Sequence, residues 1–168
     1  FIHYIDVFQE IAYNIFMDDK FFMKKALRQA QLAYMSGEVP VGAVIVKDGK
    51  VIARGKNARE TGKNAVLHAE LTAIQKACKK LGGWRLIGCT LYVTLEPCIM
   101  CAGAIMNSRI ERIVIGTSDK KAGAYGGIMD INSLPVNHIP QVEIGILEEQ
   151  CSEILKDFFK QLRLKKRI

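Results

Sequence analysis

The chain has 168 residues, of which 49% are hydrophobic and 24% are charged, and its formal net charge is +7. This composition is typical of a soluble globular protein, and the length suits one ordinary domain with a substantial core. No apolar run approaches the ~18 residues needed to cross a bilayer, so a membrane-spanning protein is excluded.

The N-terminal segment lacks the features of a targeting sequence. Residues 1–16 contain two acidic residues and no Lys or Arg, whereas a secretory signal begins with a basic stretch. Met17 is a plausible start of the protein. We therefore expect an extension of uncertain status over residues 1–16 and a single domain over residues 17–168.

Helical spacing of apolar residues begins at Asp18 and predicts a helix that is capped by Asp18 or Asp19 and ends at Gly37. Two strands are expected at residues 43–46 and 51–54. The turn between them, at residues 47–50, carries the Asp-Gly signature of a hairpin. A polar loop follows over residues 55–64.

Alternating helices and strands make up the rest of the chain. A second helix is expected to carry His68 in its first turns and to end at Gly82, and a third to open at Pro97. Strands are expected at residues 90–94, 112–116 and 142–146, before a final amphipathic helix from about residue 147. This order predicts an α/β fold, a three-layer α/β/α sandwich with a mixed five-stranded sheet and the hairpin at its antiparallel edge.

Two short clusters carry the chemistry, His68-Ala69-Glu70 and Pro97-Cys98-Ile99-Met100-Cys101. A structural zinc site normally has four protein ligands, whereas a catalytic site has three and leaves a position for water. Cys98 and Cys101 share one face of a helix N-terminus, where the helix dipole favours thiolates. We interpret His68, Cys98 and Cys101 as ligands of Zn²⁺. Glu70 would carry a proton from the water to a leaving nitrogen.

Each cluster alone has a plainer interpretation. A lone His near an apolar stripe is usually a core residue, and a lone Cys-x-x-Cys is often structural or redox-active. Their joint occurrence, each at a helix start, favours catalysis. The odd number of cysteines, five, indicates a reducing compartment such as the cytoplasm and metal binding rather than disulfides.

The C-terminal segment is strongly basic. Residues 156–168 contain six basic residues and one acidic residue. Such a segment suits a polyanion such as RNA, but a solvated basic tail is an equally common interpretation.

His-x-Glu followed by Pro-Cys-x-x-Cys is the signature of zinc-dependent deaminases. Over residues 17–167 the sequence resembles the bacterial tRNA-specific adenosine deaminases, a family with a cytidine deaminase-like fold. The resemblance rests on residues 37–44, 57, 68–70, 91–98, 100–105, 108–110, 119–124 and 157–159. It implies one catalytic Zn²⁺ per subunit, a homodimer, and hydrolysis of adenosine to inosine at the wobble position (position 34) of tRNA. The substrate implied is the anticodon stem-loop of an arginine tRNA with anticodon ACG.

The resemblance also implies a base pocket. Asn57 would hydrogen-bond the flipped base, and Pro40, Val41 and the backbone of Ala69 would border it. From the sequence alone, Asn57 could instead satisfy a turn.

Further RNA contacts are implied by the same resemblance. Asp119 and Lys121 match a loop that meets flanking nucleotides, and Phe159 and Arg163 match a C-terminal contact. Phe158 and Phe159 are adjacent on a helix, so at most one can face the core squarely and the other is free to stack on a base. Asp119 does not attract phosphate, and a hydrogen bond to a 2′-hydroxyl would explain it.

One segment departs from the family. The family usually has Pro-Thr-Ala before the ligand His, whereas this chain has Ala65-Val66-Leu67, with Asn64 expected to keep the helix cap.

Two other functions compete with the one that the resemblance implies. A deaminase of a free base or nucleoside, of guanine or cytosine type, would use the same zinc chemistry without the basic aromatic helix. A non-catalytic zinc-stabilised RNA-binding module has no use for Glu70 and lacks an obvious fourth ligand, since His3 and His138 lie outside any ligand spacing.

Overall fold

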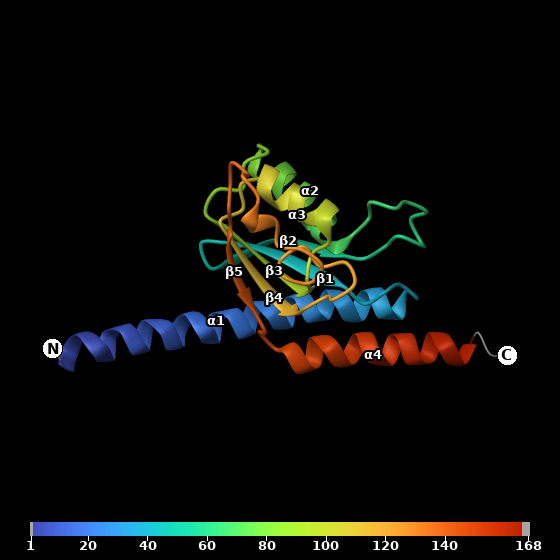
Figure 1. Cartoon of the computed structure of the whole chain (residues 1–168), viewed down its shortest axis with the longest axis horizontal. Coiled ribbons are helices and arrows are strands. Elements are labelled where there is room, and N and C mark those ends of the chain that lie inside the picture. The colour runs from blue at the N-terminus through green and yellow to red at the C-terminus, as the bar shows by residue number, and fades with distance from the viewer. Residues whose placement is uncertain (1, 166–168) are drawn as a thin grey trace.

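A computed structural model describes the backbone of residues 2–165 and the side chains of residues 19–165. Within that range one sheet lies between two layers of helices (Figure 1). The helices are α1 (Ile2–Met35), α2 (Ala69–Leu81), α3 (Ile99–Asn107) and α4 (Glu148–Lys165), with a 3₁₀ turn, η1 (Ile131–Ser133). The strands are β1 (Gly42–Lys47), β2 (Lys50–Lys56), β3 (Cys89–Leu95), β4 (Arg112–Thr117) and β5 (Gln141–Ile144).

The sheet has the order β2-β1-β3-β4-β5. Strand β1 is antiparallel to both β2 and β3, whereas β3–β4 and β4–β5 are parallel. Helices α1 and α4 lie side by side against one face, and α2 and α3 cover the other (Figure 1). The predicted sandwich and its mixed sheet are confirmed. In the described part of the chain, no helix combines the length and the apolar character that crossing a membrane requires.

Side chains of the central strands alternate between the two helical layers, as the two-residue period of a strand requires. On β1, Ala43 and Ile45 join the core beneath α2 and α3, whereas Val44 and Val46 join the core beneath α1 and α4. The hairpin turn is also as predicted, since Asp48 (φ 49°) and Gly49 (φ 67°) both have the positive φ of a type I′ turn.

The predicted cap of the first helix is wrong. Helix α1 runs without a break from Ile2, so neither Asp18 nor Asp19 begins it. Asp19 is instead buried and receives two hydrogen bonds of 2.7 Å from Arg112 and one of 2.8 Å from Tyr92. These partners lie on β4 and β3, far away in sequence. The assignment of residues 1–16 as an N-terminal extension stays a prediction, because a continuous helix α1 does not test it.

Candidate active site

His68 lies where β2 and α2 meet. Gly55 on β2 packs so closely on the start of α2 that a Cβ there would lie 1.9 Å from the carbonyl oxygen of Ala69. This close approach holds the start of α2 against the sheet. His68 is the N-cap of α2 with extended backbone (φ −76°, ψ 155°), not a residue of its first turn as predicted. The predicted cap by Asn64 is also wrong, because its Oδ1 accepts the N–H of Val66 in a local turn.

The two cysteines lie beyond the carboxyl end of β3. Cys98 is the N-cap of α3 (φ −72°, ψ 171°) and Cys101 is in its first turn, so the expected helix N-terminus is present. The prediction that Pro97 opens this helix is wrong, because Pro97 precedes the N-cap, Cys98. Parallel strands β3 and β4 end at this edge of the sheet, which is where α/β proteins usually bind ligands.

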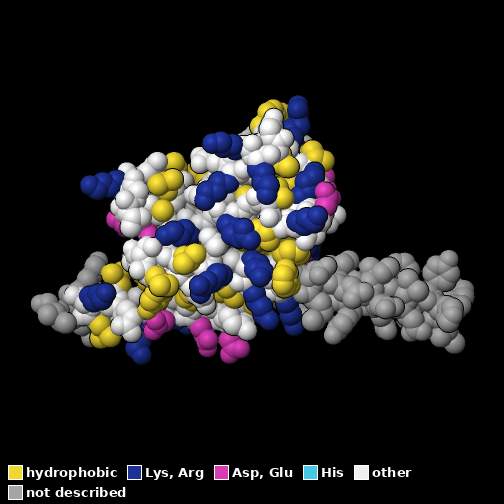
Figure 2. Space-filling model, turned by 180° about the vertical axis from the view of Figure 1, so that it is seen from behind, with side chains coloured by type: hydrophobic (Ala, Val, Ile, Leu, Met, Phe, Trp, Pro, Cys, Tyr) yellow, Lys and Arg dark blue, Asp and Glu magenta, His cyan; other side chains and the backbone are white. Residues whose placement is uncertain are grey.

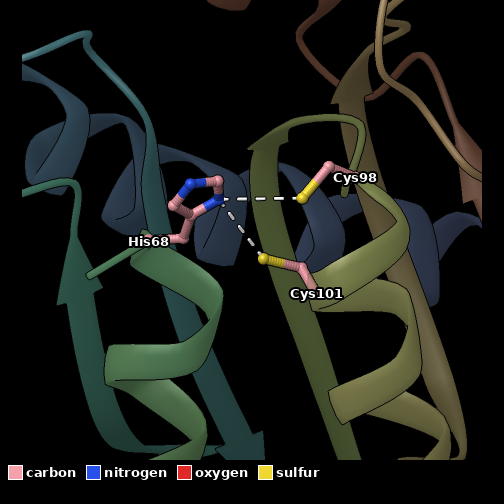
Figure 3. A group of neighbouring side chains, drawn as sticks. All are labelled: His68, Cys98 and Cys101. Carbon is pink, nitrogen blue, oxygen red and sulfur yellow. Dashed lines mark hydrogen bonds between the residues drawn. The ribbon is translucent and has the colours of Figure 1, made fainter. Parts of the chain in front are cut away.

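His68, Cys98 and Cys101 converge (Figure 3). The Nδ1 atom of His68 lies 3.8 Å from Sγ of Cys98 and 3.5 Å from Sγ of Cys101. Zinc bonds of ~2.05 Å to nitrogen and ~2.3 Å to sulfur, at a tetrahedral angle, place those atoms about 3.6 Å apart. All three ligand atoms lie within 4.8 Å of one another. The donor set and its spacing therefore fit a metal ion with tetrahedral coordination.

Hydrogen bonding within the group favours the thiolate form of Cys98. Hydrogen bonds from Cys101 and His68 lower the pKa of Cys98 to about 3. The hydrogen bond between His68 and Cys98 raises the pKa of His68, and a separate hydrogen bond between Cys101 and Cys98, together with burial, raises the pKa of Cys101. Metal ligation requires a deprotonated thiolate and a neutral imidazole, so metal binding at this group would be coupled to the release of protons.

Glu70 lies in the first turn of α2 and is 3% exposed. Burial raises its pKa, and the nearby Cys98 thiolate acts in the same direction, against the lowering effects of its own backbone N–H and of His68. A raised pKa makes a carboxyl group easier to protonate, which suits a group that acts as base and then as acid. The arrangement thus places a buried carboxyl group, Glu70, beside three side chains that could hold a metal ion.

Removal of one thiol should abolish metal retention without unfolding the domain. We expect Cys98→Ala to lower the zinc content of the purified protein from about one ion per chain to well below half, because only two ligands remain. Atomic emission measures the content, and circular dichroism checks the fold. Cys78→Ala is the matched control, since Cys78 is partly exposed and outside the group of ligands. Full zinc in Cys98→Ala would refute the ligand assignment.

A cavity of about 200 Å³ opens onto this group. Its wall includes His68, Glu70 and Cys98, together with Asn57 and Asp119. Further lining residues are Val39, Val41, Arg59, Ala69, Leu95, Glu96 and Ala122. The structure thus brings most of the expected pocket residues to one cavity. Pro40 is buried and does not line it, although Val39 and Val41 on either side do.

A second cavity, of about 400 Å³, lies beside α4 and contains the other expected RNA residues. Lys121, Phe159 and Arg163 line it, with Lys156 adding a third cation. Phe159 is 41% exposed, whereas Phe158 packs edge-on against Tyr34 with ring centroids 5.6 Å apart. One Phe therefore anchors α4 and the other faces outward. Leu95 lines both cavities, so they are neighbours.

Sequence reasoning missed three residues near these cavities. Arg59 is a cation in the wall of the first cavity, and its position two residues after Asn57 was a usable signal. Glu38 and Glu96 are buried carboxylates that accept backbone N–H groups from loops around the site. Nothing local in the sequence distinguishes them from exposed acids.

Comparisons with known proteins agree with this geometry. The family of MafB19-like deaminases matches residues 17–163. A tRNA-specific adenosine deaminase of Bacillus subtilis is 49% identical over 150 residues, which cover 89% of this chain and 93% of the relative. A solved structure from work on A-to-I editing by tRNA:A34 deaminases at the wobble position is 45% identical, with a TM-score of 0.77, covering 80% of this chain and 98% of that one. A guanine deaminase from Bacillus subtilis is 36% identical, with a TM-score of 0.57, covering 84% of this chain and 91% of that one.

The sheet order, the His/Cys/Cys group and the neighbouring Glu define a deaminase of the cytidine deaminase-like class, whose members are zinc enzymes. The similarity extends along most of the chain rather than over the metal motif alone. The chain belongs to the family of tRNA-specific adenosine deaminases.

Proposed function

We propose that this protein hydrolyses adenosine to inosine at the wobble position (position 34) of tRNA, with the ACG anticodon stem-loop of an arginine tRNA as its substrate. The observation that carries the proposal is the pairing of two neighbouring cavities. One contains the His68, Cys98 and Glu70 side chains, and the other is a basic groove with an exposed aromatic ring. The first suits a single reacting base, and the second suits the strand that carries it.

The cavity over the metal-binding group is small. Its volume of about 200 Å³ lies below the ~300–1,000 Å³ typical of pockets for drug-sized ligands. It therefore suits one heterocyclic ring rather than a whole nucleotide. For a substrate base within a nucleic acid, such a pocket requires the base to be turned out of its strand.

Asn57 is held in a fixed orientation in the pocket wall. It is 6% exposed, and its Nδ2 donates to the carbonyl oxygen of Val39 at 3.2 Å and to Glu38 at 3.5 Å. A side chain that reads a base must be fixed in this way before the base arrives. We assign Asn57 to the hydrogen bond with the flipped adenine, with Val41 and the Ala69 backbone beside it and Pro40 as support.

His68, Cys98 and Cys101 would hold one Zn²⁺ per subunit. When bound, zinc would supply Lewis acidity, which lowers the pKa of a bound water to about 7. Glu70 takes the proton of the attacking water and delivers it to the departing amino group, acting first as base and then as acid. Its burial excludes solvent from this transfer. Asn57 meanwhile holds the purine ring in position relative to Glu70.

The basic groove would bind the strand on either side of the reacting base. Lys121, Lys156 and Arg163 supply positive charge, and Phe159 offers a ring for stacking. Lys and Arg side chains are spread over the face in Figure 2, whereas the acidic side chains visible there are fewer and lie near its margins. This distribution favours a polyanion. Lys166 and Arg167, which add to the basic segment, lie outside the described residues.

We expect Arg163→Ala to raise KM for the stem-loop about three- to tenfold with little change in kcat, and to weaken the salt dependence of binding by about one charge. Lys79→Ala on the exposed face of α2 removes the same charge elsewhere and serves as the control. Steady-state kinetics at several salt concentrations measure both effects. Equal effects of the two substitutions would show that only net charge matters.

Asp119 lines the pocket with its Oδ1 accepting the N–H groups of Lys121 and Ala122, at 2.9 and 3.3 Å. We propose that this carboxylate also accepts the 2′-hydroxyl of a flanking ribose, which DNA lacks. Asp119→Ala should therefore reduce the preference for RNA over a DNA stem-loop of the same sequence. An unchanged preference would contradict this role.

A homodimer in the cytoplasm completes the proposal. Helix α3 exposes Ile99 (51%) and Met100 (37%), and nothing lies within 4 Å of a Cβ built on Gly103. An exposed apolar helix face of this kind suits contact with a second subunit. The free thiols of all five cysteines suit a reducing compartment.

A free-base deaminase is the second candidate, because this chain is also similar to a guanine deaminase structure. The basic groove with Phe159 argues against it, since a free base has no phosphates to bind. The test of the proposal is to map inosine in an arginine tRNA transcript with anticodon ACG. Inosine confined to position 34 supports it. Inosine at scattered adenosines, or none, would contradict it.

A further inference from the structure

Glu96 is a buried carboxylate outside the set of predicted site residues. It follows β3 directly and precedes Pro97 and Cys98, and its backbone N–H continues the β3–β4 pairing by donating to Thr117 at 2.9 Å. It is 3% exposed. The structure gives Glu96 no ion-pair partner among the side chains that it describes, so this carboxylate is buried without a cation.

Its charge is balanced by backbone N–H groups of one loop. Oε2 accepts the N–H of Asp119 at 2.8 Å, and Oε1 accepts those of Tyr125 and Gly127 at 2.8 and 2.9 Å. Hydrogen bonds to an ionised acceptor are about twice as strong as neutral ones. One carboxylate therefore gathers both ends of residues 119–127.

The middle of this loop is held against residues 96–98. Gly123 forms an isolated bridge with Cys98, and the N–H of Ala124 donates to the carbonyl oxygen of Pro97 at 2.9 Å. A Cβ on Gly123 would lie 2.2 Å from Cδ of Glu96, so the loop closes over the carboxylate only with glycine there. The loop and the Glu96–Cys98 segment thus form one unit.

This loop contributes lining residues to both cavities. Asp119 and Ala122 line the cavity with His68 and Glu70, whereas Lys121 lines the basic groove with Phe159. A displacement of the loop would change the distance between the RNA groove and the reacting base. It would not remove any metal ligand.

We propose that Glu96 is a positioning residue for the RNA substrate, which fixes the loop of residues 119–127 relative to the metal-binding segment. The inference rests on the proposed function, from which it takes RNA as the substrate. Glu96 fixes the position of the RNA-binding groove relative to the pocket before RNA arrives. RNA binding therefore has less of the loop to order. Its loss should therefore weaken RNA binding more than it slows chemistry.

The test substitutes Glu96→Gln in the zinc-loaded full chain. One of the two oxygens becomes an NH₂ donor that opposes a backbone N–H, so at least one arm of the loop is released. We expect KM for the stem-loop to rise about tenfold or more, while kcat stays within about threefold and the zinc content is unchanged. Hydrogen exchange at the amides of Asp119, Tyr125 and Gly127 should accelerate.

Glu111→Gln is the matched control. Glu111 also accepts a backbone N–H, that of Gly88 at 2.9 Å, but it is exposed and lies at the opposite end of the sheet. It should change neither KM nor exchange in the loop. If Glu96→Gln does not fold, Gly123→Ala perturbs the same contact with Glu96 intact and should give the same result.

An unchanged KM together with unchanged exchange at the three amides would overturn the inference, as would loss of zinc and kcat with KM preserved. Wild-type activity on the stem-loop, measured first, tests the proposed function separately. If RNA is not the substrate, exchange still reports whether Glu96 holds the loop. Accelerated exchange with no change in RNA affinity would count against its role in positioning RNA.

Discussion

Glu70→Gln should form inosine at least 10²- to 10⁴-fold more slowly than the wild-type enzyme, which is the usual contribution of a positioned acid or base. Gln preserves the size of the side chain but cannot carry a proton from the water to the amino group. The three metal-binding side chains are unchanged, so zinc content and affinity for the stem-loop should persist. Single-turnover kinetics measure the rate and the affinity for the stem-loop, and metal analysis measures the zinc content.

The matched control is Glu143→Gln, at an exposed position of the edge strand β5, which should retain full activity. Activity of Glu70→Gln within tenfold of wild type would refute its role as proton carrier. Loss of zinc from the same variant would instead show that Glu70 supports the metal-binding group. A non-catalytic zinc-stabilised RNA-binding protein would show no turnover in any form.

Arg112→Met should reduce the free energy of unfolding by about 3–5 kcal/mol, because it leaves the Asp19 carboxylate buried without its cation. The side chain of Asp19 is 4% exposed, and Arg112 contacts both of its oxygens at 2.7 Å. For a chain of this size, each kcal/mol lowers Tm by roughly 2–4 °C. Denaturant unfolding and thermal scans of the zinc-loaded enzyme measure the loss.

Arg54→Met on the exposed side of β2 is the control and should change stability by less than about 0.5 kcal/mol. Replacing both members of the pair, as Asp19→Leu with Arg112→Met, should recover part of the stability because no uncompensated charge remains. A stability loss below about 1 kcal/mol in Arg112→Met would contradict the account. The pair lies at the end of β4 opposite the site, so activity below the melting temperature should persist.

Features specified by local sequence were predictable. The Asp48-Gly49 turn, strand β1 and the Cys-x-x-Cys at a helix start all depend on residues within a few positions of one another. The proximity of His68, Cys98 and Cys101 was predictable for the same reason, since each cluster carries its own signal.

Features set by distant partners were not predictable. Asp19 has the sequence pattern of a helix cap, yet its position is decided by Arg112, 93 residues away. Asn64 was expected to cap α2, but the four residues to His68 allow a local turn instead. The role of Glu96 depends on amides 23 to 31 residues later, in a loop without hydrophobic periodicity. Such a carboxylate cannot be distinguished from a surface acid until the loop is placed.

The most direct test of the proposed activity is product formation by the zinc-loaded protein with four substrates side by side. These are an ACG anticodon stem-loop, free adenosine, guanine and cytidine. We predict that inosine forms in the stem-loop alone, since both the metal cavity and the basic groove are needed. Conversion of a free base or nucleoside with the stem-loop untouched would preserve the chemistry of His68, Cys98, Cys101 and Glu70 but contradict the assigned substrate.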